Sequence, residues 1–189
     1  MTAALSSRFS RGNSGAAVEF QRKMSASSPA LRKEAERVVR SAKSVGRSVA
    51  TVESCTAGAL ARLLADAEGA GDVFQGGIVA YTKAAKSALV GVLSELLEKH
   101  TAVSREVALA LARGGLQRIP GDVVVAVTGV AGPEPDEDGN PVGLVHIAAV
   151  SRKGAELHLE RRFGRKSKDE ILQGSIGDGL TLLAELVAA

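Results

Sequence analysis

The chain has 189 residues, of which 45% are hydrophobic, 24% are charged and 3% are aromatic. This length and apolar content suit one α/β domain with a packed core and leave little room for a second. The formal charge is +3, but residues 1–24 hold four basic side chains and one acidic one, so the remainder is neutral. A neutral chain with few aromatic residues lacks the basic stripe and stacking surfaces of nucleic-acid binders, so we expect no nucleic-acid partner.

The sequence shows no targeting signal or membrane span. No apolar run approaches the roughly 18 to 20 residues of a spanning helix, and the start of the chain lacks the apolar centre of a secretory signal. The single cysteine, Cys55, cannot form an internal disulfide and is consistent with a reducing compartment. We therefore expect a cytoplasmic protein with no membrane contact.

Residues 1–27 differ in composition from the rest of the chain. They are rich in Ser, Arg and Gly and poor in large apolar residues, so they cannot bury enough surface to offset their chain entropy. We expect a disordered tail, or a start codon placed upstream of Met24. The Ser- and Arg-rich, acid-poor character also resembles an organelle transit peptide. The folded domain is expected to cover residues 28–189.

The first half of this domain alternates helices and strands. Ser28 is suited to cap a helix with Pro29 in its first turn, and apolar residues recur at helical spacing as far as Ala42. The pattern then predicts a strand over 48–52, a helix over 57–64, a strand over 77–81 that runs into a short Lys/Ala helix, and a helix from Ser104.

The second half contains the most apolar strands. Val123–Val127 and Leu144–Val150 are continuous apolar runs, as in strands buried on both faces. Residues 156–163 form a weaker, alternating strand, and a helix from about Lys168 to Leu186 is predicted despite three internal glycines. The alternation predicts an α/β fold, a three-layer α/β/α sandwich with a mostly parallel sheet of about five strands, a mixed sheet also being allowed.

Ligands of open α/β sheets bind beyond the carboxyl ends of the strands, so the turns after strands are the candidate sites. The first such turn places Ser54, Cys55 and Thr56 between a strand and a helix, where hydroxyls and free N–H groups share the positive helix end. Ser or Thr is also the ordinary N-cap, and the local pattern alone favours capping over a nucleophile. Cys55 is either a second candidate nucleophile or a small core residue.

The second turn contains the only tyrosine of the chain. Tyr81 ends the predicted second strand, and Lys86 lies about one helical turn beyond it, so both side chains could aim at the same point. A half-buried tyrosine and a solvated lysine are the plainer interpretation of this pattern.

The third turn, Thr128-Gly129-Val130-Ala131-Gly132-Pro133, follows the most apolar strand. Glycines there allow the backbone to approach a ligand and to present N–H donors to an anion or a developing oxyanion. No Gly-Lys-Ser/Thr follows, so the turn is not a Walker motif and ATP hydrolysis is not indicated.

Metal chemistry is not indicated either. His100, His146 and His158 lie far apart and none has ligand spacing with a second His or a Cys, which favours core or surface roles. The acidic run over 134–138 lacks the regular alternation and distal glutamate of an EF-hand, so a solvated loop is expected.

Taken in order, the three turns belong to a longer pattern of spaced blocks. These are Glu53-Ser54-Cys55-Thr56 with Gly58, Gly76-Gly77-Ile78-Val79-Ala80-Tyr81 with Lys86, Gly91-Val92, His100 with Ala102-Val103-Ser104, Thr128-Gly129-Val130-Ala131-Gly132-Pro133, and Pro141-Val142-Gly143. Together they resemble the C-terminal domain family of the competence/damage-inducible protein CinA, the nicotinamide-nucleotide amidases. The resemblance extends from about Ala30 to the C-terminus, and six ordered blocks are far more specific than any single one.

The resemblance implies an α/β/α amidohydrolase of the free-standing type, expected to be a homodimer. It would deamidate nicotinamide mononucleotide to nicotinate mononucleotide and ammonia in pyridine nucleotide salvage, without metal or cofactor. Ser54 would be the nucleophile, with Tyr81 and Lys86 as activating partners, and a base at Lys86 would need its pKa lowered from about 10.4 toward 7 or 8. Substrate contacts are expected from Thr56, Gly58, Gly77, Thr128, Gly129, Ala131, Gly132, Arg165 and Lys166.

Three positions differ from the family pattern. Ala57 stands where the family usually has glycine, an acidic segment over 134–140 replaces a glycine-rich one, and Asp169-Glu170 occupy the place of a second arginine. These differences keep two alternatives open. One is a catalytically weak nucleotide- or partner-binding module of the same fold, and the other is a serine amidase for a different small carboxamide.

Overall fold

The computed structural model describes residues 28–189, so the tail predicted over 1–27 lies outside the described residues. The strands are β1 (Val49–Glu53), β2 (Phe74–Val79), β3 (Val123–Gly129), β4 (Leu144–Ser151) and β5 (Glu156–Arg162). The helices are α2 (Pro29–Ser44), α3 (Ala59–Ala65), α4 (Ala70–Val73), α5 (Lys83–Val90), α6 (Ser94–His100), α7 (Arg105–Arg118) and α8 (Lys168–Ala188).

The five strands form one mixed sheet in the order β2-β1-β3-β4-β5. β1 is parallel to both β2 and β3, whereas β4 runs antiparallel to β3 and β5. The predicted five-stranded α/β sheet is therefore confirmed, with parallel strands in one half and antiparallel strands in the other. The second strand begins earlier than predicted, at Phe74, and ends at Val79, which pairs with Glu53, the last residue of β1.

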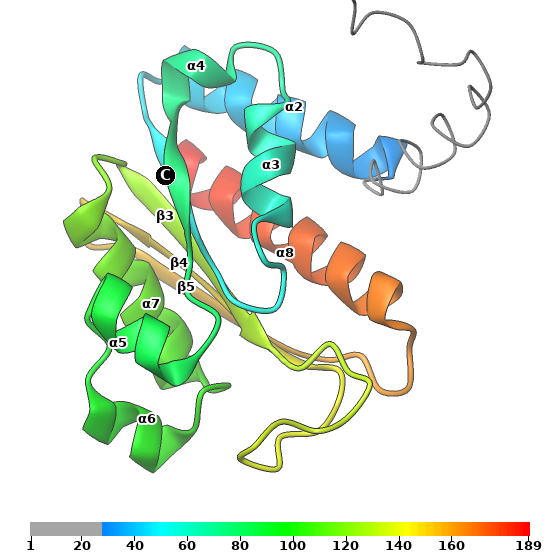
Figure 1. Ribbon diagram of the computed structural model, residues 1–189. Coiled ribbons are helices and arrows are strands. Elements are labelled where there is room, and N and C mark those ends of the chain that lie inside the picture. Colours follow the sequence, from blue (N-terminus) through cyan, green and yellow to red (C-terminus); the bar gives the residue numbers. More distant parts are fainter. Residues whose placement is uncertain (1–27) are drawn as a thin grey trace, which may run out of the picture.

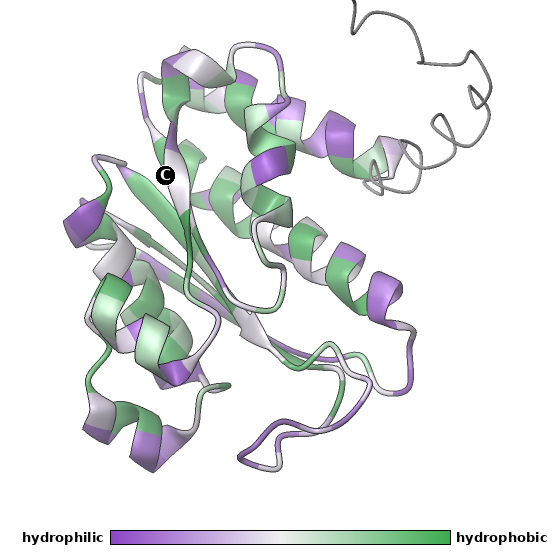
Figure 2. Ribbon diagram, in the orientation of Figure 1, coloured by the Kyte–Doolittle hydropathy of each residue, from purple (hydrophilic) through white to green (hydrophobic). Residues whose placement is uncertain are grey.

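Helices cover both faces of this sheet, as the three-layer prediction requires (Figure 1). α2, α3 and α8 lie on one face, and α5, α6 and α7 lie on the other. Because successive side chains of a strand point to opposite faces, β3 sends Val123, Val125 and Val127 into the first core and Val124 and Ala126 into the second. β3 is accordingly among the most hydrophobic parts of the chain, while the loop between β3 and β4 is hydrophilic toward its tip (Figure 2).

Glycines within α8 allow close packing rather than ending the helix. A Cβ atom on Gly179 would lie 3.0 Å from Leu60 Cδ2, and one on Gly174 would lie 2.6 Å from the Phe163 ring. The helix is started by a capping box between Ser167 and Glu170. By length and composition α8 could also cross a membrane, but 50% of its apolar window is buried inside the fold.

The chain changes direction across the sheet at β1. It leaves β1 through α3 on one face to reach β2, then returns through α5, α6 and α7 on the opposite face to β3, on the other side of β1. The two connections diverge at the carboxyl end of β1, which opens a crevice there. This is where the three polar turns meet.

Candidate active site

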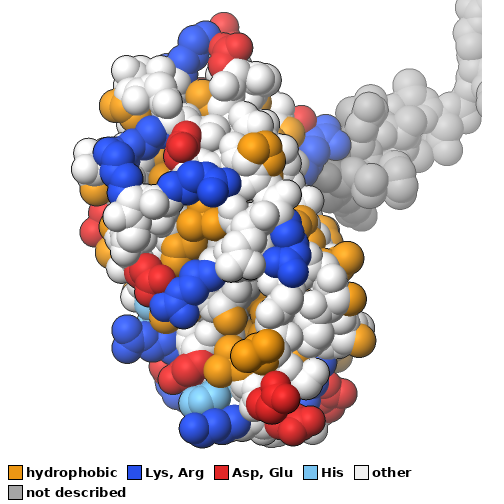
Figure 3. All heavy atoms as spheres, turned by 90° about the vertical axis from the view of Figure 1, so that its left-hand side faces the viewer, with side chains coloured by type: hydrophobic (Ala, Val, Ile, Leu, Met, Phe, Trp, Pro, Cys, Tyr) orange, Lys and Arg blue, Asp and Glu red, His pale blue; other side chains and the backbone are white. Residues whose placement is uncertain are grey.

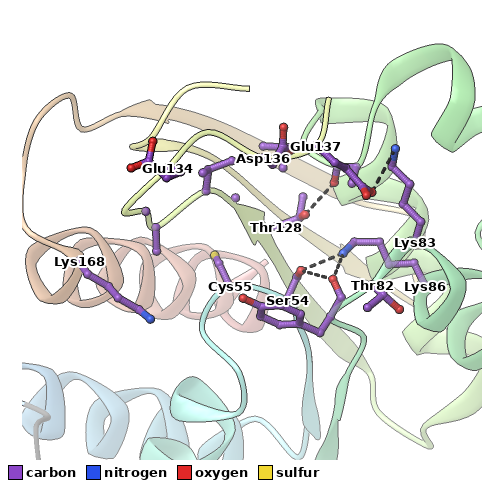
Figure 4. A pocket seen from close by; sticks show the side chains of 17 residues that line it. Ser54, Cys55, Thr82, Lys83, Lys86, Thr128, Glu134, Asp136, Glu137 and Lys168 are labelled. Atoms are coloured by element: carbon purple, nitrogen blue, oxygen red, sulfur yellow. Dashed lines mark hydrogen bonds and ion pairs between the residues drawn. The ribbon is translucent and has the colours of Figure 1, made fainter. Parts of the chain in front are cut away.

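A cavity of about 390 Å³ lies at the carboxyl ends of the three parallel strands. Its walls come from the turn after β1, the turn after β2 with the start of α5, the loop after β3, and the first residue of α8. Figure 4 shows the side chains that face it. The volume is within the range of small-molecule pockets.

Ser54 and Lys86 are in contact within this cavity. Lys86 Nζ donates to Ser54 Oγ at 2.8 Å, to the carbonyl of Ala80 at 3.1 Å and to the carbonyl of Tyr81 at 3.0 Å (Figure 4). Lys86 is 1% exposed and Ser54 is 6% exposed. The amine thus directs its three donors at three oxygens, none of which is a carboxylate, so its charge is not neutralised by an ion pair.

Burial lowers the pKa of the Lys86 amine to about 8. Asp136 and Glu137, which line the same cavity, oppose part of this shift. An amine with this pKa is partly neutral near neutral pH. The neutral form can keep two N–H groups on the carbonyls of residues 80 and 81 and turn its lone pair to the Ser54 hydroxyl, which is the arrangement of a nucleophile and its base.

Tyr81 contributes its backbone rather than its phenol to this network. Its carbonyl accepts from Lys86 Nζ at 3.0 Å and from the Ser54 hydroxyl at 3.3 Å. The side chain lines the cavity but is 66% exposed, and its hydroxyl makes no hydrogen bond with any residue of the described range. The family resemblance implied the phenol as an activating partner, and that role stays a prediction. The carbonyls are free to contact Lys86 because the β1–β2 ladder ends at Val79, which leaves the next peptide oxygens unpaired within the sheet.

Glu53 holds the turn that carries Ser54, a role that the sequence analysis missed. Its carboxylate is 1% exposed and accepts from the backbone N–H groups of Gly58 (2.9 Å), Leu60 (3.1 Å) and Ala61 (2.7 Å), and from Thr51 Oγ1 (3.2 Å). α3 begins after a glycine that has no side chain to cap it. A strand residue therefore caps the helix that follows, and a glutamate inside an apolar strand was the available signal.

Cys55 is not suited to act as the nucleophile. It lines the cavity, but burial raises the pKa of its thiol to about 12, so the reactive thiolate is not formed near neutral pH. The backbone N–H groups of Cys55 and Thr56 face this sulfur and make no other hydrogen bond within residues 28–189. They are available to a ligand oxygen.

The glycine-rich turn after β3 forms the opposite wall of the cavity. Thr128, Gly129, Ala131 and Gly132 all line it, as the sequence predicted for a ligand-facing turn. Thr128 is fully buried and donates its hydroxyl to the Ala102 carbonyl at 2.8 Å, so the side chain ties this turn to the segment before α7.

Five other predicted substrate contacts lie outside the cavity wall. Gly58 gives its N–H to Glu53, and a Cβ on Gly77 would lie 2.5 Å from Thr51 Oγ1, so both glycines serve packing around β1. Thr56 is buried, and its hydroxyl lacks a hydrogen-bond partner among the described residues. The remaining two, Arg165 and Lys166, are exposed and do not line the cavity.

The basic residue at the cavity from this part of the chain is Lys168, which the sequence analysis did not select. It is the first residue of α8 and lines the cavity, where Figure 4 shows it on the side opposite Lys83. Within the described range its ammonium has no carboxylate partner. Lys168 follows the N-cap residue Ser167, whereas Arg165 and Lys166 precede it and lie outside the cavity.

The loop between β3 and β4 (residues 130–143) closes one side of the cavity and is fastened at its tip. Asp138 accepts from Lys83 Nζ at 2.5 Å and from the Ala102 N–H at 3.2 Å. Asp136 accepts from the Asp138 N–H at 3.0 Å and from the Asn140 N–H at 2.8 Å. This acidic segment is thus ordered by internal hydrogen bonds and by an ion pair to α5, and is not simply a solvated loop.

The histidines lie outside the cavity. His146 on β4 and His158 on β5 approach each other with Nδ1 and Nε2 3.0 Å apart, and burial lowers the pKa of both imidazoles. His100 lies 3.6 Å from Glu106. No group of three or more His, Cys, Asp or Glu side chains in residues 28–189 is arranged to hold a metal ion.

Comparison with known proteins assigns the family. The model of the CinA C-terminal domain matches residues 31–187. The chain belongs to the CinA C-terminal domain family. It is 45% identical over 147 residues to the CinA-like protein of Synechococcus sp. (strain RCC307), covering 77% of this chain and 35% of that protein. It is 51% identical over 118 residues to the CinA-like protein of Mycobacterium avium (strain 104), covering 62% of this chain and 27% of that protein.

Solved structures of the family share the fold over nearly their whole length. The competence/damage inducible protein CihA from Agrobacterium tumefaciens is 38% identical, with a TM-score of 0.80 over 84% of this chain and 96% of that one. A CinA superfamily protein from Escherichia coli is 31% identical, with a TM-score of 0.78 over 82% and 90%. By contrast, this chain spans about a third of the length of the curated CinA-like relatives it matches.

Proposed function

We propose that this CinA-family chain is a serine amidohydrolase that converts nicotinamide mononucleotide to nicotinate mononucleotide and ammonia. The observation that carries the proposal is the 2.8 Å contact between the Ser54 hydroxyl and a buried lysine whose pKa is lowered to about 8. A pair of this kind is the usual apparatus of covalent amide hydrolysis. A binding module has no need of a buried amine aimed at a hydroxyl, so the pair favours an enzyme.

The reaction begins with proton transfer from Ser54 to neutral Lys86. Ser54 Oγ attacks the carboxamide carbon, and the tetrahedral oxyanion is held by backbone donors. The free N–H groups of Cys55 and Thr56 and the glycine-rich turn after β3 are the candidates. One such donor is worth about 3 to 4 kcal/mol in the transition state.

Collapse of the tetrahedral intermediate breaks the carbon–nitrogen bond. Lys86 returns its proton to the departing nitrogen, which leaves as ammonia, and the nicotinoyl group remains as an ester on Ser54. Lys86 then takes a proton from water as it attacks the ester carbonyl, and the acid product leaves with Ser54 restored. Throughout, the carbonyls of residues 80 and 81 keep the amine oriented toward Ser54.

Charges around the cavity match the two charges of the mononucleotide. The carboxylates of Glu134, Asp136 and Glu137 lie on one wall and the unpaired ammonium of Lys168 on another. We infer that the pyridinium ring lies toward the acidic wall and the phosphate toward Lys168. The ring cation also withdraws electrons from the carboxamide, so the mononucleotide should react faster than neutral nicotinamide.

A coupled ammonia assay on the purified chain tests the reaction. We expect ammonia from nicotinamide mononucleotide without added metal, at a rate that increases as the pH rises through about 8 because Lys86 must lose its proton. Ser54→Ala should lower kcat at least about 10³-fold. Unchanged ammonia release by this variant would show that the nucleophile is wrongly assigned.

The phosphate contact is tested by comparing the mononucleotide with its dephosphorylated riboside. Lys168→Ala should raise KM for the mononucleotide and leave the riboside unaffected, whereas Lys166→Ala, a matched change outside the cavity, should alter neither. If the riboside is used as well as the mononucleotide by the unmodified chain, the enzyme is a serine amidase for a wider set of carboxamides.

A further inference from the structure

The acidic wall of the cavity is tied to the helix that carries the base. The ion pair between Lys83 and Asp138 fastens the tip of the β3–β4 loop to the first residue of α5, three positions before Lys86. Positions three apart lie on the same side of a helix. The loop carboxylates are therefore held at fixed places relative to the Lys86 amine, on the wall of the same cavity that adjoins Lys83 (Figure 4).

Few charged groups face this amine. The Cys55 thiol lies on the β1 side, Asp136 and Glu137 from the loop favour the charged form of the amine, and Lys83 from its own helix disfavours it. Glu137 also forms an ion pair with Lys83, with Oε1 3.4 Å from Nζ. Glu134 lines the same cavity from the same loop but lies nearer its start. The protonation of Lys86 is thus sensitive to two carboxylates that make no hydrogen bond to it.

We propose that Asp136 and Glu137 are positioning residues that act through Lys86, favouring its charged form in the empty cavity and losing that effect when a cationic substrate neutralises them. This inference rests on Lys86 being the base of the proposed reaction, but not on the identity of the amide. Binding of a cationic ring would therefore lower the pKa of Lys86 and release the proton of its amine to solvent. A neutral carboxamide of the same shape would meet a lysine that is still charged.

Two pH profiles separate the free enzyme from the complex, since kcat/KM reports ionisations of the first and kcat those of the second. For nicotinamide mononucleotide, we expect the midpoint of the kcat profile below that of kcat/KM. Glu137→Gln should lower the kcat/KM midpoint by about half a pH unit, and adding Asp136→Asn by about one. The midpoint of the kcat profile should move less, so the difference in pH between the kcat/KM midpoint and the kcat midpoint should become smaller. Glu134→Gln, on the same wall but nearer the start of the loop, should move the midpoints less than Glu137→Gln. Glu185→Gln, at an exposed position outside the cavity, is the matched control and should leave them in place.

Labelling of Ser54 by phenylmethanesulfonyl fluoride, followed by mass spectrometry, gives the same information without a substrate. This neutral reagent reports the free enzyme, so Glu137→Gln should speed labelling about threefold at pH 7, and Lys86→Met should slow it at every pH. If labelling depends on Lys86 but the profiles of Glu137→Gln and the double variant superimpose on the unmodified chain, this inference is wrong and the proposed function stands.

Three other outcomes distinguish this inference from the proposed function. A Glu134→Gln shift as large as that of the double variant would overturn the assignment to Asp136 and Glu137. If Ser54 is labelled in a Lys86-dependent way but nicotinamide mononucleotide yields no ammonia, the substrate proposal fails while the tuning of Lys86 is still measured. A chain with neither labelling nor ammonia release would contradict Lys86 as a base and remove both.

Discussion

Basic side chains have opposite roles at the two ends of the parallel strands, which we call the carboxyl edge and the amino edge of the sheet. At the carboxyl edge of β1, Lys86 is buried against a hydroxyl and two carbonyls, and burial lowers its pKa to about 8. At the amino edge, Arg47 donates to the carbonyls of Leu186 and Val187, at the end of α8. Arg152 likewise donates to the carbonyls of Leu116, Ile119 and Gly121, at and beyond the end of α7.

This difference follows from the chemistry of the two cations. A guanidinium stays charged in proteins and offers five donors in a plane, so it suits the unpaired carbonyls at helix C-termini. An ammonium can lose its proton when buried, so it suits a site where a proton must move. The face in Figure 3 shows basic side chains interspersed with acidic ones rather than gathered in a stripe. Because Arg47 and Arg152 each donate to several helix-end carbonyls, we relate these two arginines to packing.

The largest expected effect comes from exchanging the cation at the carboxyl edge. Lys86→Arg keeps the charge but cannot form a neutral base, so ammonia release from nicotinamide mononucleotide should fall about 10²- to 10⁴-fold. In Lys86→Met, where the side chain fills a similar volume without charge, ammonia release should fall by a similar factor. Activity within tenfold of the unmodified chain in Lys86→Arg would mean that the buried amine is not the base.

Changing the anion that supports the carboxyl edge should have the next largest effect. Glu53→Gln replaces one acceptor oxygen by a donor, so two of the groups now bonded to the carboxylate lose their acceptor. We expect the free energy of unfolding to fall by about 2 to 3 kcal/mol in urea titrations, with a loss of activity as the Ser54 turn loosens. Glu68→Gln, at an exposed position, is the control. Equal stability of the two variants would rule out the capping role.

At the amino edge, the same type of exchange should affect stability alone. Arg152→Lys keeps the charge but cannot reach three carbonyls at once, so the free energy of unfolding should fall by about 1 to 2 kcal/mol. The kcat of ammonia release, measured well below the unfolding temperature, should not change. A fall in kcat without a fall in stability would break the contrast between the two edges.

The smallest effect concerns the turn between Ser54 and α3. Ala57 has φ +50°, a left-handed conformation that costs an L-residue roughly 1 to 2 kcal/mol, whereas glycine adopts it freely. Because glycine also loses more entropy on folding, Ala57→Gly should stabilise the chain by no more than about 1 kcal/mol and leave activity intact. Ala88→Gly, inside α5, should instead destabilise by about 0.5 to 1 kcal/mol. If Ala57→Gly lowers the free energy of unfolding, the backbone at Ala57 is not strained.

Much of the fold could be predicted because it depends on local pattern. Continuous apolar runs identified β3 and β4, and Ser28 caps α2 as expected from its place before Pro29. The short helix α6 and the start of β2 were not predicted, since a seven-residue helix and a strand containing Gly76 and Gly77 have weak periodic signals.

The candidate site was predictable only in part. The sequence indicates Ser54, Lys86 and the turn over 128–132 as candidate site residues, and the structure brings them to one cavity. The place of Lys168 was missed because composition alone does not define which residue of a basic segment faces the cavity. Glu53 was missed as a cap because its partners lie beyond a turn whose path the sequence does not define.

By itself the sequence determined which segments are buried and where polar turns follow strands, since both depend on residues close together in the chain. The tertiary structure decided which of those polar groups meet. Lys86 lies 32 residues from Ser54, and Lys83 lies 55 residues from Asp138, so these contacts exist only once strand order and register are set. The pKa of Lys86 is a product of the same packing, because a lysine on an exposed helix face would keep its ordinary value.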